Sequence, residues 1–301
     1  MKKISVLTSL YNCKHFLPYY YQGVLQMQNT EEIEILLLHN APKEDELSFI
    51  KENLLPLDYV KHIVIPERET LYATWNRGIQ IASGEYITIW NVDDYRFPDS
   101  LHIQSQVLDN SPNVTMVYGD VYISSIEGKY EKGKKTNEPS YSQKNRKEFL
   151  RSYHTTCFQM WRKSIHYSIG YYDEQFRCSG DFDFQIRVAS KYTLKKTEQI
   201  LGVYLADQPH KISNNGFQEL ENNIIYLRYG VYDKINYLSL YKATQLYKKK
   251  QYLFLKKWEN HQETVLFSRF QQCVNFTIGF LKIPFFVLRS IYHKLKERIA
   301  E

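Results

Sequence analysis

The chain has 301 residues, of which 43% are hydrophobic and 24% charged. This composition is ordinary for a soluble globular protein and excludes both wholesale disorder and a polytopic membrane protein. The length is enough for one large or two modest domains. The apolar run after Met1 covers only residues 4–10 and includes Ser5, Thr8 and Ser9, so it predicts a strand and not a signal peptide.

The four cysteines lie far apart, with no C-x-x-C pair and no histidine at zinc-binding spacing. This pattern indicates free thiols in a reducing compartment, and we expect a cytoplasmic protein.

The first half of the chain alternates short apolar runs with segments of helical length. The predicted strands are residues 4–10, 33–38, 62–65, 86–90 and 114–118, and the predicted helices are residues 15–28, 43–55 and 70–82. Such alternation predicts an α/β fold with a mostly parallel sheet flanked by helices. Sheets of this kind bind ligands beyond the carboxyl ends of their strands, so residues 11–12, 39–40 and 91–94 are candidates for a site.

The second half is less regular. Residues 127–147 are polar and predict a mobile surface loop, whereas residues 153–161 are strand-like and residues 181–190 helical. After about residue 216 the sequence becomes rich in tyrosine and lysine with helical patterning. We therefore predict a catalytic domain over residues 1–215 and a basic helical extension over residues 216–301.

Two adjacent carboxylates, Asp93 and Asp94, follow the predicted strand 86–90. Carboxylates in this place can hold a hard divalent cation against a diphosphate, which favours Mg²⁺ or Mn²⁺. An Asp-Asp pair after a strand also caps helices and forms turns, so this pair alone is weak evidence.

The wider pattern is more specific. The segments SVLTSLYN, ETLYATWNRGIQIASGEYITIWNVDDYRFPDSL, IGYYDEQF and SGDFDFQIRVA resemble, in this order, the GT-A glycosyltransferases of family 2. The resemblance covers roughly residues 3–215, and residues 69–101 are its most specific part. It implies a Rossmann-like GT-A fold and transfer of a sugar from a nucleotide sugar to an acceptor hydroxyl, usually with inversion.

The resemblance also implies a metal site. Asp93 matches the last position of the family's D-x-D motif and is the implied metal and donor ligand. Asn91 occupies the first position, where the family normally has Asp, and is an implied donor contact. Asp94 matches a second acidic position that ligates the metal, orients Asp93 or caps the next helix. His210 lies in LADQPHKISNN, a segment where related enzymes place a histidine near the metal or the diphosphate, and is an implied second metal ligand.

Asp181 matches the acidic residue that, in similar enzymes, accepts the proton of the acceptor hydroxyl. The reaction needs such a group, because a sugar hydroxyl is a poor nucleophile until a base removes its proton. The residue before it, Gly180, replaces the usual Glu. The alternative is that Asp181 caps the helix that follows.

Donor binding is implied for five further residues. Thr8 and Ser9 lie in the first matched segment, and Asn76 lies where relatives approach the diphosphate. Tyr11 either stacks on the base or is an ordinary buried tyrosine. Asn40 follows the second strand, where the family commonly has a carboxylate; its amide can still bond a pyrimidine edge, which favours a UDP-sugar.

The sequence therefore predicts an inverting, metal-dependent glycosyltransferase of surface polysaccharide or lipid-linked oligosaccharide synthesis. One alternative is a binding-only homologue, suggested by Asn91, Gly180 and the absence of an acid at residues 39–40. Another is a nucleotidyltransferase, although the segment after the first strand has no glycine-rich phosphate loop.

The C-terminal segment is strongly basic. Residues 242–301 contain twelve Lys and Arg against four Asp and Glu, whereas the rest of the chain carries 27 against 29. From residue 285 onward, apolar residues recur at helical spacing beside basic ones: Phe285, Leu288, Ile291, Tyr292, Leu295 and Ile299. This pattern predicts a helix that lies on an anionic membrane surface, at the inner face of the cell membrane. The alternatives are a solvated face, or docking on the catalytic domain or on a second subunit; no nucleic acid is expected.

Overall fold

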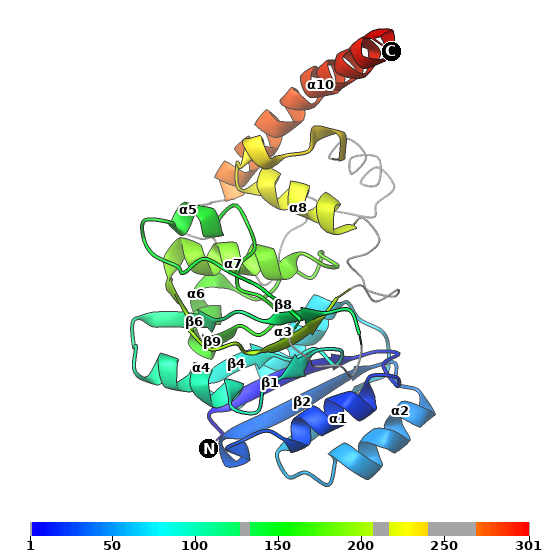
Figure 1. Ribbon diagram of the computed structural model, residues 1–301, viewed down its shortest axis with the longest axis vertical. Helices are drawn as coiled ribbons and strands as arrows, with labels where there is room; N and C mark the ends of the chain where they lie inside the picture. Colours follow the sequence, from blue (N-terminus) through cyan, green and yellow to red (C-terminus); the bar gives the residue numbers. More distant parts are fainter. Residues whose placement is uncertain (1, 127–132, 207–216, 240–268, 301) are drawn as a thin grey trace.

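The computed structural model describes residues 2–126, 133–206, 217–239 and 269–300. Its centre is a seven-stranded sheet (Figure 1) with the strand order β10-β6-β9-β4-β1-β2-β3. The strands are β1 (Ile4–Leu10), β2 (Ile33–Asn40), β3 (Val60–Ile65), β4 (Tyr86–Ile89), β6 (Val114–Tyr118), β9 (Met160–Arg162) and β10 (Thr193–Lys196). Strand β9 is antiparallel to both neighbours, and the other pairs are parallel. The predicted mostly parallel α/β sheet is confirmed.

Helices cover both faces of this sheet. One face packs against α1 (Leu17–Leu25), α2 (Glu44–Phe49) with its π-helical continuation Ile50–Leu54, and α4 (Ser100–Asp109). The other face packs against α3 (Leu71–Ile81), α6 (His166–Ile169) and α7 (Gly180–Lys191). Alternate side chains of β2 serve the two cores, because successive residues of a strand point to opposite faces: Ile35 and Leu37 belong to the first core and Leu36 to the second.

A smaller sheet adjoins the large one. It has the order β5-β11-β7-β8, with β5 (Tyr95–Arg96), β7 (Tyr122–Ser124), β8 (Lys134–Lys135) and β11 (Gly202–Leu205). Short turns of 3₁₀ helix at Thr30–Glu32, Lys163–Ile165 and Tyr232–Lys234, and α5 (Arg146–Phe149), complete the small elements.

Two segments in this region differ from a plain reading of their sequence. The described part of the predicted surface loop, from residue 133 onward, contains β8 and bonds the body: the Asp120 carboxylate accepts the Glu138 backbone N–H at 2.9 Å and the Thr136 hydroxyl at 3.2 Å. The strand predicted over residues 153–161 shrinks to β9. Here the backbone N–H of His154 bonds the Gln185 side chain at 2.7 Å, and Thr156 has a φ of 54°, so the chain cannot run extended.

The C-terminal part contains α8 (Phe217–Arg228) and α10 (Arg269–Ala300). A buried ion network ties α8 to the body: Arg228 bonds Asp183 of α7 at 2.8 Å and Asp173 at 3.0 Å. Helix α10 packs on α8, where the Asn275 amide donates to the Arg228 carbonyl at 3.1 Å, and then projects away from the body (Figure 1). Helix α10 contains Pro284 and continues beyond it as a single helix.

Candidate active site

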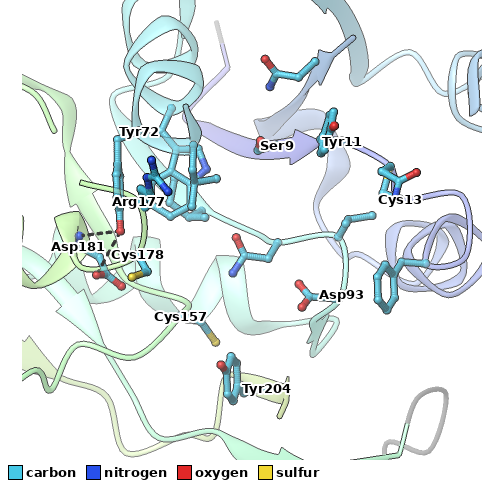
Figure 2. A pocket seen from close by; sticks show the side chains of 18 of the residues that line it. Ser9, Tyr11, Cys13, Tyr72, Asp93, Cys157, Arg177, Cys178, Asp181 and Tyr204 are labelled. Atoms are coloured by element: carbon cyan, nitrogen blue, oxygen red, sulfur yellow. Dashed lines mark hydrogen bonds between the residues drawn. The ribbon is translucent and has the colours of Figure 1, made fainter. Parts of the chain in front are cut away.

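A cavity of about 1380 Å³ opens at the carboxyl ends of β1, β2 and β4, with walls formed by α3, α7 and α8. Six residues predicted from the sequence line this cavity: Ser9, Tyr11, Asn40, Asn91, Asp93 and Asp181. Figure 2 shows Asp181 with Tyr72 and Cys178 on one side and Asp93 on the other, nearer to Tyr11. Two carboxylates thus face one space from different walls.

Asp181 is the second residue of α7. Its Oδ1 accepts the Phe182 backbone N–H at 2.9 Å and lies 3.5 Å from the Tyr72 hydroxyl (Figure 2). Tyr153 also lines the cavity near this carboxylate, and its hydroxyl donates to the Thr156 carbonyl at 2.6 Å. Burial is the main cause that raises the pKa of Asp181 to about 6. A carboxylate with this pKa is ionised at neutral pH and accepts a proton more readily than an ordinary aspartate.

Sequence reasoning missed Tyr72, which bonds Asp181, and Tyr153, which lies near it. Burial, followed by the charge of Asp181, holds the pKa of Tyr72 and of Tyr153 well above the usual value, so both remain hydroxyl donors. Tyr72 lies in the quoted segment ETLYATW, but nothing in its spacing predicts contact with a residue 109 positions later. Its ring also explains Gly180, since a Cβ there would lie 2.7 Å from the Tyr72 ring.

The two carboxylates that follow β4, Asp93 and Asp94, have different roles. Asp93 faces the cavity, whereas Asp94 is 4% exposed and accepts the Leu205 backbone N–H at 3.0 Å. The Asn91 amide donates to the other oxygen of Asp94 at 3.0 Å. Asp94 therefore has a structural role, and Asp93 is the carboxylate of this motif that faces the cavity. Its oxygens suit Mn²⁺ or Mg²⁺, which bind few protein carboxylates and keep other oxygen ligands.

The Tyr11 side chain is 44% exposed at the cavity and is not a core tyrosine. The Arg68 guanidinium lies 4.0 Å from the centre of the Tyr11 ring and donates to its hydroxyl at 3.2 Å. The pair offers an aromatic face beside a cation. Arg68, which also lines the cavity, was not predicted from the sequence.

Four predicted site residues lie elsewhere or have structural bonds. Asn40 reaches the cavity edge but bonds the Thr74 hydroxyl at 2.8 Å and the Glu69 backbone N–H at 3.1 Å, which holds the start of α3. Two predicted donor contacts are corrected: Thr8 pairs with the Tyr20 hydroxyl at 2.7 Å, Asn76 bonds the Tyr172 carbonyl at 2.9 Å, and neither lines the cavity. His210 lies outside the described residues.

Helix α2 brings a buried carboxylate close to the end of β2. Its Glu46 is fully buried, accepts the backbone N–H groups of Lys14 at 3.2 Å and Lys43 at 3.1 Å, and lies 3.3 Å from His39 Nε2. With Cys13 these groups place three potential metal ligand atoms within 4.8 Å of one another. Because backbone donors already occupy both oxygens of Glu46, we assign it to fixing the loop after β1.

The mostly parallel sheet, the small second sheet and the carboxylates at the strand ends define the GT-A class of nucleotide-sugar-binding folds. Residues 5–171, more than half of the chain, match the family described as Glycosyl transferase family 2. The chain belongs to this family.

Curated relatives agree with this assignment. An uncharacterized glycosyltransferase of Methanocaldococcus jannaschii is 25% identical over 239 residues, which cover 79% of this chain and 68% of the relative. An uncharacterized glycosyltransferase of Haemophilus influenzae is 28% identical over 131 residues, 42% of this chain and 50% of that one.

Solved structures confirm the GT-A fold. S. aureus TarS residues 1–349 in complex with UDP superpose with a TM-score of 0.57 at 12% identity, covering 75% of this chain and 64% of that one. The mannosyltransferase PcManGT from Pyrobaculum calidifontis, in complex with GDP-Man and Mn²⁺, gives 0.56 at 12% identity, covering 75% and 63%. The chain thus spans just under two thirds of these longer proteins.

The raised pKa of Asp181 predicts a stability cost. The folded protein binds a proton at Asp181 up to about pH 6, whereas an unfolded aspartate releases it near pH 4, so the free energy of unfolding falls as pH rises through this window. Asp181→Asn does not titrate there. Its melting temperature should exceed that of the wild type above pH 6.5, and the difference should shrink toward pH 4. Thermal unfolding between pH 4 and 8 measures this, with the exposed Asp99→Asn as control. A difference independent of pH would refute it.

Proposed function

We propose that the protein is an inverting, metal-dependent glycosyltransferase that moves a sugar from a nucleotide sugar to an acceptor hydroxyl. The observation that carries the proposal is that Asp181, with its raised pKa, and Asp93 face one cavity from different walls. One carboxylate is suited to take a proton, and the other is suited to hold a cation.

The Asp181 carboxylate accepts the proton of the acceptor hydroxyl while that oxygen attacks the anomeric carbon of the donor. The bond from this carbon to the diphosphate oxygen breaks in the same displacement, so the nucleoside diphosphate leaves and the configuration inverts. Tyr72 orients the carboxylate through its hydroxyl. Asp93 would hold Mn²⁺ or Mg²⁺, which supplies positive charge to the leaving diphosphate.

A UDP-sugar is the favoured donor. Tyr11 presents a ring on which a base can stack, and Arg68 places a cation beside it. Ser9, Asn40 and Asn91 add polar groups along the same wall. TarS, which shares the fold, is bound to UDP in one structure and to UDP-GlcNAc in another.

The acceptor is a saccharide or a lipid-linked saccharide of polysaccharide synthesis. The cavity wall beside Asp181 is polar, with Arg177 from the loop before α7 and Gln218 and Asn222 from α8. Such side chains suit a ligand rich in hydroxyls. The C-terminal extension therefore contributes to the acceptor side of the cavity.

We further propose that α10 attaches the enzyme to an anionic membrane surface at the inner face of the cell membrane. One face of α10 is docked, since Ile283 is 8% exposed and Phe286 stacks on Tyr237 with ring centres 4.0 Å apart. The other carries a stripe of exposed apolar side chains at spacings of three and four residues: Ile278, Leu281, Phe285, Leu288 and Tyr292. Among the described residues, packing of α10 on α8 and on Tyr237 therefore leaves this stripe uncovered.

Charge favours lipid over a second copy of the chain. Lys282 and Arg289 are exposed beside the stripe, and residues 269–296 contain no Asp or Glu. If two copies paired along the stripe, these flanking cations would repel one another. Anionic headgroups would attract them. Across the described residues, no helix combines the length and the apolar character needed to span a bilayer, so contact is proposed at the surface.

Replacing the proposed base tests the reaction. Asp181→Asn should lose about 10²- to 10⁴-fold in kcat, because removing a positioned base typically costs this much, while donor affinity stays nearly unchanged. The assay is nucleotide release from a panel of nucleotide sugars with Mn²⁺. Normal turnover in Asp181→Asn would reject the assignment of the base. A wild-type protein that binds nucleotide sugars and turns none over would instead be a binding-only homologue.

Replacing Asp93 tests the metal. UDP should bind the wild type at least tenfold more tightly with Mn²⁺ than without it, a difference of about 1.4 kcal/mol or more. Asp93→Asn should remove this difference, whereas Asp99→Asn, exposed at the start of α4, should retain it. Calorimetric titrations with and without Mn²⁺ measure both. Equal metal dependence in Asp93→Asn and the wild type would disprove the metal assignment.

The apolar stripe can be tested without removing α10. The double variant Leu281→Glu/Leu288→Glu changes side chains that are 76% and 67% exposed, so folding should be preserved while sedimentation with phosphatidylglycerol vesicles is lost. Wild-type binding should weaken steeply as salt rises, since surface charges are screened. The matched control is Leu55→Glu/Ile81→Glu, at sites 41% and 50% exposed outside α10. Absence of wild-type binding, or equal loss in the control, would overturn the proposal.

A further inference from the structure

A buried carboxylate of α8 clamps the loop that leads to Asp181. Glu221 is fully buried, and its Oε1 accepts the Arg177 backbone N–H at 2.8 Å. Its Oε2 accepts the next two, from Cys178 at 2.9 Å and Ser179 at 2.9 Å. Three successive backbone N–H groups thus converge on one side chain, an arrangement that binds anions well.

This clamp lies directly before the proposed base. Ser179 is the N-cap of α7, and its own side chain makes no capping bond. The carboxylate of Glu221, 42 residues later in the chain, instead holds the backbone up to this N-cap, and the Asp181 N–H in the first turn donates to the Tyr72 hydroxyl at 3.3 Å. Asp181 follows two residues after Ser179, so the backbone that Glu221 holds determines where the Asp181 carboxylate lies.

The clamp is itself anchored. At the other end of α8, Arg228 is buried and bonded to Asp183 of α7 and to Asp173. Helix α8 is therefore attached at two places. Glu221 holds the loop 177–179 before α7, and Arg228, two turns further along α8, bonds α7 itself. Gln218 and Asn222, which precede and follow Glu221 in α8, face the cavity.

We propose that Glu221 is a positioning residue for Asp181, holding residues 177–179 so that the carboxylate is set at the reacting hydroxyl. This inference rests on the proposed function only in taking Asp181 as the base. Five titratable side chains interact electrostatically with Asp181: Glu221, Tyr72, Tyr153, Tyr172 and Cys178. Of these, Glu221 carries a like charge and raises the pKa of Asp181.

Glu221→Gln tests the proposal, because Gln keeps the size but loses the charge and one acceptor. A displacement of the base of about 1 Å costs on the order of 10²-fold, so kcat should fall by this amount with donor affinity unchanged. The pH below which kcat declines should also move downward, since the like charge beside Asp181 is gone. The matched control is Glu219→Gln, on the same helix but exposed and bonded to Ser239 Oγ at 2.7 Å. Its kcat and pH profile should match the wild type.

Two measurements do not depend on turnover. Titration of the Asp181 side-chain carbon by NMR should give a lower pKa in Glu221→Gln than in the wild type and in Glu219→Gln. Burial and then the charge of Glu221 raise the pKa of Cys178, whose Sγ lies 3.4 Å from Glu221 Oε2. Alkylation of Cys178 should therefore be faster in Glu221→Gln, which removes the second cause. Peptide mass spectrometry separates Cys178 from the other cysteines.

The outcomes are distinguishable. Faster alkylation in Glu221→Gln with unchanged kcat, pH profile and Asp181 titration would show a purely structural clamp and overturn the proposal. If the wild type transfers no sugar from any nucleotide sugar, the proposed function fails. The Asp181 titration then still decides whether Glu221 governs this carboxylate: a shift in Glu221→Gln but not in Glu219→Gln supports it, and no shift overturns it.

Discussion

The active-site wall depends on one buried carboxylate, Asp183. It accepts Arg187 Nε at 2.9 Å, Arg228 Nη1 at 2.8 Å and the Tyr229 hydroxyl at 2.8 Å. Taking one partner away would leave a charge buried without compensation, which costs about 3–5 kcal/mol. Because Asp183 lies on α7 and Arg228 on α8, this network makes α8 part of the framework that carries Asp181.

The sheet could be predicted from the sequence because each buried parallel strand is a short apolar run between helical segments. Predicted strands 4–10 and 114–118 match β1 and β6 residue for residue. Strand β9 was overestimated, because residues with high strand propensity lie in a segment whose N–H groups bond Gln185 and not a neighbouring strand. Local propensity does not contain that tertiary contact.

The site was predictable in part for a similar reason. The position of Asp93 and Asp181 follows from where strand and helix begin and end. The face of the strand on which each residue points does not follow from these limits. Thr8 and Ser9 are adjacent, yet only Ser9 lines the cavity, because successive strand residues point to opposite sides. Tyr72, Tyr153 and Glu221 were missed because each lies near Asp181 or its loop across a large sequence separation. Arg68 was missed because a lone arginine before a helix has no distinctive spacing.

Two of the three features that suggested a degenerate site, Asn91 and Gly180, have physical reasons in this structure. Asn91 donates to Asp94, where an aspartate would place two carboxylates about 3 Å apart and repel. Gly180 makes room for the Tyr72 ring, and that ring carries a hydroxyl 3.5 Å from Asp181. Asn91 thus bonds Asp94 without repulsion, and Gly180 admits the ring whose hydroxyl reaches Asp181. Neither change removes Asp93 or Asp181 from the cavity, and this is why we favour an active transferase over a protein that only binds the donor.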